Sequence, residues 1–324
     1  MQQPLAKTFV KLQPRKWDGG AITMPGLYYD LPIDVYHSGD VCSEPSISSS
    51  GLRTIFNQSP AHYWVSSPYN PDRVLEEETD ALTLGRAAHH LLFGQEEFGK
   101  QFVMRPLTVN GEDCNRRTRH GKIWHKIQEE RGLTIVTPAQ VQAIQGMAQS
   151  LAEHPLVKAG ILNGLIEHSL FAKDQESGLY LKARPDVIPN DSLDFADLKT
   201  TESVDYRKLV WTIRDYGYHI QAGLLNLLCR MVLKQPMASY SLVFVEKNPP
   251  WCVRVVTLKP SEIDRGERSC RAALDLFKTC WETQHWPGPG GDQHDAQYIE
   301  LDGYTRDAID ERLKQEFGMK LEIR

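Results

Sequence analysis

Two carboxylates and a lysine stand in this chain at a spacing that suits metal-dependent cleavage of a phosphodiester. Asp186 closes an Arg-Pro-Asp triplet, ten residues follow, and then comes Asp197-Leu198-Lys199. That last triplet is the only acid-x-Lys sequence in the chain. Carboxylate oxygens bind hard divalent cations, and a lysine beside them can offset charge that develops on a phosphate. The spacing makes a nuclease the leading interpretation.

The neighbouring residues predict that this pair of acids lies at the ends of strands. A period of two over 192–199 places four residues on one face of a strand, namely Leu193, Phe195, Asp197 and Lys199. A second strand-like run, 180–184, leads into Pro185 and Asp186, and proline suits a strand end. We expect Asp186 and Asp197 to meet at adjacent strand ends. The alternative is an ordinary hairpin whose charges are solvated.

Other segments of the chain could complete such a site. A helix predicted over 84–92 carries Gly85 four residues before His89, although a lone histidine on such a face is more often a packed core residue than a ligand. A helix that opens at 216 follows Lys199 in the right order to pack behind the strands. Two serine-containing runs stand nearer the N-terminus, at 47–52 and 59–64.

Taken in order, these segments resemble the RecE-like branch of the PD-(D/E)xK nuclease superfamily. These are phage and prophage exonucleases related to exodeoxyribonuclease VIII and, more distantly, to lambda exonuclease. Six motifs between roughly residues 45 and 260 support it: the Ser-x-x-x-Leu and Ser-Pro-Ala-His-Tyr helix, the Gly-x-x-x-His helix, the strand 167–171, the Arg-Pro-Asp turn, the Asp-Leu-Lys strand and the Tyr-x-x-Gln-Ala helix. The resemblance implies an α/β fold with a mixed central β-sheet flanked by helices.

The resemblance also implies hydrolysis that depends on Mg²⁺, with Mn²⁺ as a substitute and two ions in each active site. Asp186 and Asp197 are expected to hold metal together with the main-chain carbonyl of Leu198. His89 and Glu167 match the family positions that complete a second metal site. A slip of one residue along the helix would exchange His89 for His90, which otherwise is expected to be structural.

The remaining site residues are assigned by the same resemblance. Lys199 is expected to orient or activate the attacking water and to offset charge in the transition state. Gln221 would position that water or the Lys199 amine. Tyr218 and Arg184 are expected to contact DNA.

The basic residues of the chain are local rather than spread over its surface. The formal net charge is −5, which argues against a protein coated with basic surface. Basic residues concentrate between 115 and 126, where Arg116, Arg117, Arg119 and Lys122 could contact phosphates and Trp124 could stack on a base. The alternative is a solvated, mobile loop. An acidic exterior with a basic interior would suit a ring that encloses DNA.

The length of the chain suits either one large domain with appendages or two domains, and the hydrophobic pattern and turn residues support one α/β core. Helices are expected near 48–58, 79–93, 138–153 and 260–285, with one helix or a helix pair near 205–233. Strands are expected near 166–173, 179–185, 192–199, 240–245 and 252–258. We predict an irregular N-terminal extension over 1–45, the nuclease domain over 46–286, and a C-terminal appendage over 287–324 that contacts a subunit or partner. The Pro-Gly-rich stretch 286–292 separates the last two.

Cysteine usage and hydropathy indicate a cytoplasmic enzyme. The six cysteines form no Cys-x-x-Cys pair, so we expect reduced thiols and neither a zinc site nor an iron–sulfur cluster. The N-terminus lacks an apolar signal segment, and no run approaches the length that spans a membrane.

The expected function is processive 5′→3′ digestion of double-stranded DNA from its ends by a ring of three or four subunits. The 3′ overhang would pass to a RecT- or Beta-like single-strand annealing protein during phage-type recombination. Two alternatives stay open. One is a PD-(D/E)xK repair or defence nuclease with another polarity or substrate. The other is a catalytically silent DNA-binding protein on the same fold.

Overall fold

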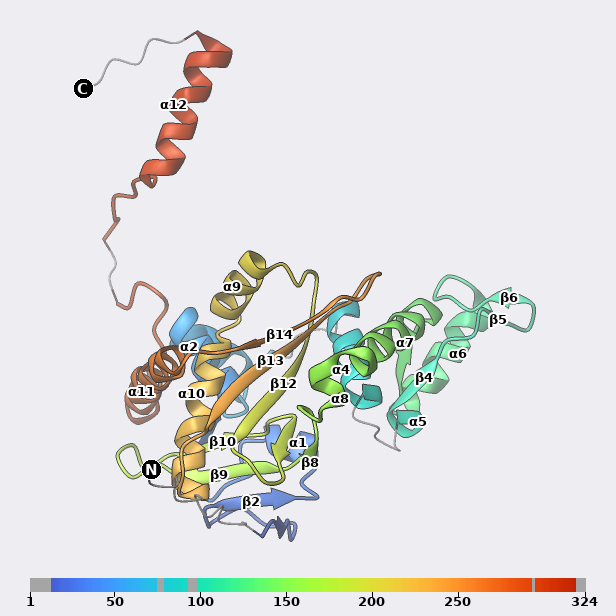
Figure 1. Ribbon diagram of the computed structural model, residues 1–324, viewed down its shortest axis with the longest axis horizontal. Helices are drawn as coiled ribbons and strands as arrows, with labels where there is room; N and C mark the ends of the chain where they lie inside the picture. The colour runs from blue at the N-terminus through green and yellow to red at the C-terminus, as the bar shows by residue number, and fades with distance from the viewer. Residues whose placement is uncertain (1–12, 75–78, 93–97, 293–294, 319–324) are drawn as a thin grey trace, which may run out of the picture. The chain divides into compact units, whose positions relative to one another are not determined.

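The computed structural model describes residues 13–74, 79–92, 98–292 and 295–318, and the chain divides into two compact units, Met1–Pro289 and Gly290–Arg324 (Figure 1). In the smaller unit, helix α12 (Gly303–Phe317) has Asp302 at its N-cap and buries none of its residues. The elements that follow belong to the larger unit.

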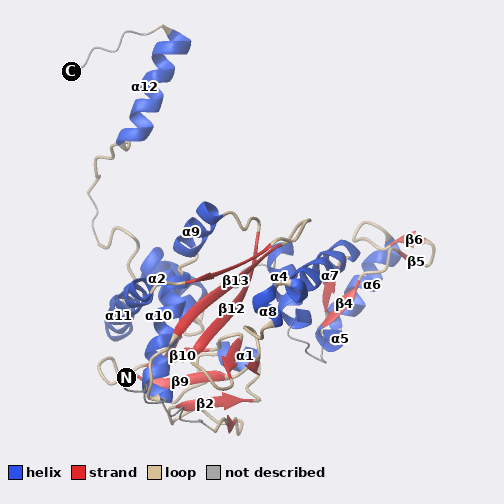
Figure 2. Cartoon of the chain, viewed as in Figure 1, coloured by secondary structure: helices blue, strands red, loops and turns tan. Residues whose placement is uncertain are grey.

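A three-stranded sheet lies at the centre of the larger unit, in the order β12 (Asp194–Thr201), β13 (Ser239–Glu246), β14 (Val253–Thr257) (Figure 2). β12 and β13 run parallel over eight residue pairs, with Asp197 opposite Leu242, and β14 is antiparallel to β13. A parallel pair needs a long crossover, which here runs through the helices α9 (Tyr206–Asp215) and α10 (Tyr218–Leu228).

Both faces of this sheet are covered by helices, so side chains that alternate along β12 and β13 enter two different cores. One face packs with α10 and with α11 (Pro260–Thr283) through Phe195, Tyr240, Leu242 and Phe244. The other packs with α4 (Asp80–Leu92) and α7 (Pro138–Glu153) through Ala196, Leu198, Val243 and Val245. By the same alternation Asp197 and Lys199 lie on the α10 side of β12.

A second sheet has five strands, β1 (Arg15–Lys16), β2 (Gly26–Tyr29), β9 (Ser169–Lys173), β10 (Tyr180–Ala183) and β3 (Ser46–Ser48), in that order. The prediction of an irregular segment before residue 46 is therefore wrong for its described part. Leu27 pairs with Leu170, and both side chains are buried. Helix α1 (Ile33–His37) follows β2 and contributes the buried Tyr36. The mixed sheets flanked by helices confirm the predicted fold class.

The strand predicted over 166–173 is two strands. β8 (Gly164–Ile166) pairs with β11 (Val187–Pro189), whereas β9 pairs with β10. Glu167, between β8 and β9, has a left-handed backbone with φ +58°. A non-glycine residue in that conformation interrupts an extended strand, so the chain changes partner there.

Helices α10 and α11 cross at unusually close range. A Cβ atom added to Gly266 would lie 1.8 Å from the His219 carbonyl oxygen, and one added to Gly223 would lie 2.3 Å from the Glu267 nitrogen. The two glycines let the helix backbones touch, which fixes α10 against the long α11. Helices α2 (Ser49–Asn57) and α3 (Pro60–Ser66) also pack on α11, and a short π-helical turn, η1 (Cys229–Leu233), continues α10.

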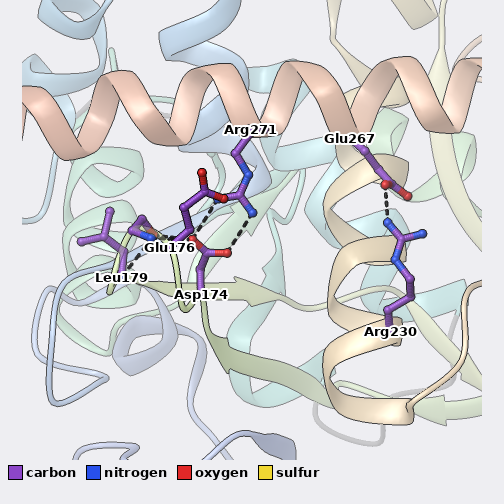
Figure 3. A network of polar contacts seen from close by, with 7 residues as sticks. Asp174, Glu176, Leu179, Arg230, Glu267 and Arg271 are labelled. Atoms are coloured by element: carbon purple, nitrogen blue, oxygen red, sulfur yellow. Dashed lines mark hydrogen bonds and ion pairs between the residues drawn. The ribbon is translucent and has the colours of Figure 1, made fainter.

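Ion pairs on α11 tie it to the five-stranded sheet and to the end of α10 (Figure 3). Arg271 donates two hydrogen bonds of 2.9 Å to the carboxylate of Asp174, in the turn between β9 and β10. Ser177 donates to the same carboxylate at 2.7 Å. Glu267 accepts from Arg230 of η1. These ion pairs fix α11 to the β9–β10 turn and to η1 at the end of α10.

Between α4 and α7 the chain forms α5 (Phe98–Gln101), β4 (Phe102–Met104), β5 (Thr108–Val109), β6 (Glu112–Asp113), α6 (Arg119–Glu130) and β7 (Thr134–Val136). The loop predicted around 116–126 is therefore largely helical. The Thr118 side chain caps α6 by accepting from the Gly121 N–H. A short helix, α8 (Pro155–Lys158), follows α7. None of the described helices has the length and apolar character needed to cross a membrane.

Candidate active site

The chain brings five of the predicted site residues together on three elements and one turn. Asp197 and Lys199 lie on β12, Gln221 on α10, and His89 on α4, whereas Asp186 lies between β10 and β11. Gln221 of α10 bonds to Asp197 of β12, and His89 of α4 bonds to Asp186 in the turn before β11. The acidic pair is thus buried rather than placed in a solvated hairpin.

Asp186 is held by two donors. His89 Nε2 lies 2.8 Å from its Oδ1, and the Leu198 N–H donates to its Oδ2 at 2.6 Å. Burial would raise the pKa of Asp186, but His89, Lys199 and the Leu198 N–H outweigh burial and hold the pKa of this carboxyl below its ordinary value. The bond from Leu198 to Asp186 joins the turn after β10 to β12, which is how the two acids come together.

Asp197 is 1 % exposed and lies in the same charged group. Gln221 Nε2 donates to its Oδ1 at 2.9 Å, and its Oδ2 contacts the Lys199 ammonium as an ion pair without the geometry of a hydrogen bond. Burial and the nearby charge of Asp186 raise the pKa of Asp197, and Lys199 opposes this only in part. Two buried carboxylates that repel one another form a site that a cation stabilises.

Lys199 and His89 carry the positive charge of the cluster. Burial would lower the pKa of Lys199, but Asp197 and Asp186 raise it above its ordinary value. Burial likewise would lower the pKa of His89, and its bond to Asp186 raises it. The Lys199 Nζ also lies 5.3 Å from the centroid of the Tyr218 ring, which is mostly buried at the start of α10.

The arrangement agrees with a comparison against protein families. Residues 48–299 match the PDDEXK-like domain of unknown function (DUF3799). The protein belongs to this PDDEXK-like family. Membership agrees with the superfamily that the motifs predicted, whereas the RecE-like branch within it stays a prediction.

A comparison with solved structures gives one with the same fold. A provisionally named exonuclease from Eubacterium rectale superimposes with a TM-score of 0.57 at 12% identity, covering 86% of this chain and 97% of its own. A phage-related exonuclease from Haemophilus somnus 129PT is 13% identical, covers 74% of this chain and 96% of its own, and has a TM-score of 0.33. Comparison with curated protein sequences gives no match.

The donors of this PDDEXK-like site suit a divalent cation. Asp186 and Asp197 supply carboxylate oxygens, the ligand type that Mg²⁺ and Mn²⁺ prefer, and burial together with the charge of Asp186 raises the pKa of Asp197. Among the described residues, no group of three or more His, Cys, Asp or Glu side chains stands ready to hold a metal ion. The fit therefore rests on the carboxylate pair, and His89 is bonded to one of its members.

The position of Glu167 is set by the pairing of β8 with β11. It follows β8 directly, one residue beyond the last β8–β11 pair, Ile166 with Val187, and its side chain is exposed. Burial lowers the pKa of Arg184, and the charges of Tyr36 and Glu167 offset part of this effect, so Glu167 lies near Arg184. Its role as a metal ligand stays a prediction.

The guanidinium of Arg184 has protein partners. It donates to Ser169 Oγ and to the Leu31 carbonyl, both at 2.7 Å, and it lies 4.8 Å from the centroid of the Tyr36 ring. A contact between Arg184 and DNA would have to replace these bonds. The structure therefore gives Arg184 a part in holding the N-terminal segment to β9.

The predicted basic segment forms part of α6 and the residues before it. Arg116 pairs with Glu129, while Arg117, Arg119 and Lys122 are exposed. Trp124 is half-buried and its ring packs edge-on against His125. α6 packs on β5, β6 and β7, so these residues lie on the segment between α4 and α7 and not on the strands that hold the acids.

Sequence reasoning did not find Arg53. It lies on α2, directly after Leu52 of the Ser-x-x-x-Leu motif, and its Nη1 donates to the Tyr216 carbonyl at 2.8 Å. Its side chain also packs 3.0 Å from the position that a Cβ on Gly217 would take. Gly217 has φ +62°, a backbone that glycine adopts readily, and it begins α10. The motif could have indicated α2, but not that its arginine contacts the start of α10.

Proposed function

We propose that this protein is a metal-dependent exonuclease that digests double-stranded DNA from 5′ to 3′ and leaves 3′ single-stranded overhangs. The observation that supports this best is the buried group of Asp186, Asp197 and Lys199, with Gln221 and His89 bonded to its acids. A partly buried lysine beside two carboxylates has no evident use in packing, whereas it suits a phosphate. The name of the structural neighbour from Eubacterium rectale points to the same activity.

In this proposal Asp186, Asp197 and the Leu198 carbonyl hold Mg²⁺ or Mn²⁺, and His89 and Glu167 complete a second ion's ligands. Bound metal would supply Lewis-acid activation of water and phosphate. The Lys199 ammonium offsets the negative charge that grows on the phosphoryl oxygens as the bond breaks. Gln221 fixes the orientation of Asp197, and Tyr218 limits the directions in which Lys199 can reach.

The wider assembly follows from the same proposal. We infer a homo-oligomeric ring of three or four subunits that encloses DNA and passes the 3′ overhang to a single-strand annealing protein in a prophage recombination pathway. Residues 290–324 support a contact role, because they form a separate unit and carry nine acidic and five basic residues, a net −4 of the chain's −5. Analytical ultracentrifugation would measure the number of subunits.

A digestion time course tests the activity directly. Duplexes labelled at one end, with 5′-phosphate or 5′-hydroxyl termini, are incubated with Mg²⁺, Mn²⁺ or a chelator. We expect loss of nucleotides from the 5′ end, only with metal. Asp186→Asn and Asp197→Asn should each abolish cleavage and keep the fold, because each removes one charge at nearly constant shape.

Asp194→Asn is the matched control for these variants. Asp194 lies on the same strand but is exposed and accepts a hydrogen bond from Ser239, so its replacement should leave digestion unchanged. Degradation from the 3′ end, or of single strands alone, would assign another nuclease substrate to the same site. Binding without cleavage under every metal would favour a silent DNA-binding protein.

A further inference from the structure

Helix α9 presents a surface that the catalytic cluster does not use. Four of its residues follow i, i+3, i+4, i+7 spacing and so form one stripe: Arg207, Val210, Trp211 and Arg214. All four are exposed, with Trp211 at 60% and Val210 at 49%. The buried residue of the helix is Leu209, on the opposite side. An indole displayed between two arginines is an unusual use of a large apolar side chain.

Two tyrosines extend this stripe at its ends. Tyr206 begins α9 and is 62% exposed, and Tyr216 follows the helix and is 63% exposed. We call the six residues, Tyr206, Arg207, Val210, Trp211, Arg214 and Tyr216, the α9 platform. It combines three aromatic side chains, two arginines and one valine.

The platform is continuous with the candidate active site. The Tyr216 ring stacks on that of Tyr218, with centroids 5.8 Å apart and planes 14° apart. The Tyr218 ring in turn lies 5.3 Å from the Lys199 Nζ. A ligand on the platform would therefore lie beside the residues proposed to cleave phosphodiesters.

The fold holds the platform in place. The Asp205 side chain caps α9 by accepting from the N–H groups of Arg207 and Lys208. Arg53 holds the Tyr216 carbonyl from α2. Because β12 ends at Thr201, α9 begins directly after the strand that carries Lys199. A displayed surface fixed at both ends can bind without the cost of ordering a loop.

We propose that the α9 platform binds an unpaired DNA strand next to the catalytic cluster, a proposal that rests on the proposed function. Tyr206, Trp211 and Tyr216 would stack on bases, and Arg207 and Arg214 would contact phosphates. Bases in a duplex already stack on one another, whereas those of a single strand are free to stack on side chains. Arg214 pairs with Asp215 at 2.7 Å, and such an exposed pair exchanges readily for a phosphate.

Affinity for a labelled short oligothymidylate, measured by fluorescence anisotropy in Ca²⁺, tests the platform. Trp211→Ala and Tyr206→Ala should each weaken binding by roughly 5- to 100-fold, the effect of losing one base–aromatic stack. Trp211→Phe should retain most of the affinity, since it keeps an aromatic face. Tyr298→Ala is the control, because Tyr298 is fully exposed outside the larger unit and should leave binding unchanged. Affinity for a blunt duplex should fall much less in every variant.

The outcomes separate the platform from the proposed activity. If the wild type digests DNA but Trp211→Ala binds oligothymidylate as tightly as the wild type, the proposal that the platform binds single-stranded DNA is wrong. The exposed face of α9 would then be a candidate surface for a protein partner instead. If the wild type binds oligothymidylate through Trp211 yet cleaves no DNA with any divalent cation, the exonuclease proposal fails while the platform stands. Circular dichroism of each variant shows that a loss of binding is not a loss of fold.

Discussion

Lys199 is only partly exposed and carries a full charge, and its charged partners are the acids of the cluster. Lys199→Ala should lower the cleavage rate by about 10²- to 10³-fold, because it removes one preorganised charge from the transition state. Binding of Mg²⁺ should survive, since both carboxylates stay. Single-turnover cleavage and calorimetry of Mg²⁺ binding measure the two effects.

Lys173→Ala serves as the matched control for that variant. Lys173 also pairs with an acid, Glu44, but at the end of β9 in the five-stranded sheet, and its side chain is partly exposed. Its replacement should leave the rate unchanged. A collapse of Mg²⁺ affinity in Lys199→Ala would instead give Lys199 a structural role.

His89 contacts Asp186, and the next residue along α4 is also a histidine. His89→Ala should impair catalysis by about 10- to 100-fold, the usual effect of losing a residue that holds or orients a metal ligand. His90→Ala should do far less, because successive residues on a helix point about 100° apart. Steady-state cleavage at several Mg²⁺ concentrations compares them. An equal loss in both, or a loss only in His90→Ala, contradicts the assignment.

At this scale the sequence indicated some partners and not others. Asp186, Asp197 and Lys199 could be found because they lie close together in the sequence and form a motif that is rare in the chain. The bond between the Leu198 N–H and Asp186 could not, since it depends on how the turn after β10 folds back. Arg53 could not be found for the same reason, because its partner, the Tyr216 carbonyl between α9 and α10, lies more than a hundred residues away in the chain.

The crossing of α10 and α11 positions Gln221 and Tyr218, and it depends on two glycines. Gly266→Ala should destabilise the fold by about 1–3 kcal/mol, because the new methyl group meets the His219 carbonyl and neither backbone can move freely. Urea denaturation measures this. Gly99→Ala on α5 is the control, because a Cβ there meets nothing within 4 Å. An unchanged midpoint in Gly266→Ala would show that the helices can separate at no cost.

Helix α6 and the residues before it carry the basic segment, and its arginines are the candidates for binding the DNA backbone. Replacing Arg116, Arg117 and Arg119 with glutamine should flatten the salt dependence of duplex binding, by about 0.9 in logarithmic slope for each phosphate that the variant no longer neutralises. Binding in Ca²⁺ at several salt concentrations measures the slope. The exposed arginines 254, 265 and 268 give a matched triple variant that should not change it. An unchanged slope in the α6 variant would show that these arginines are ordinary solvated surface residues and do not contact the DNA backbone.

Elements were predicted well where local signals are strong. The helix 138–153 has the predicted bounds, because Thr137 and Gln140 form a capping box around Pro138. β2 was missed because four residues carry no period of their own and form a strand only by pairing with β9, far along the chain. α6 was read as a loop because its buried face consists of Gly121, His125 and Gln128, which give no apolar stripe.

The stability of the whole larger unit should depend on pH through Asp174 and Arg271. Burial would raise the pKa of Asp174, but Arg271 and Ser177 lower it to about 2. A lowered pKa stabilises the fold fully above the ordinary value of 3.8, and this stabilisation is lost as the pH falls from there to about 2. Arg271→Gln should cost about 2 kcal/mol at neutral pH, and the difference from wild type should shrink below pH 4.

Urea unfolding at pH 7, 4 and 3 measures that difference, with Arg268→Gln as the control. Arg268 lies on the same helix and pairs with Asp264, but both side chains are largely exposed, so its loss should matter little at any pH. A constant difference between wild type and Arg271→Gln across this range would show that the pair does not titrate with unfolding.

The parallel pairing of β12 with β13 determines at what stage of synthesis and folding the site can form. Asp194 pairs with Ser239, and between them lie α9, α10 and η1. Contacts between residues so distant in sequence form slowly, because a long loop must close first. A chain emerging from the ribosome presents Asp186, Asp197 and Lys199 well before β13 is made, yet it lacks the strand that completes their sheet. Under the proposed function, DNA in the producing cell meets a cleaving enzyme only after nearly the whole domain has been synthesised and has folded.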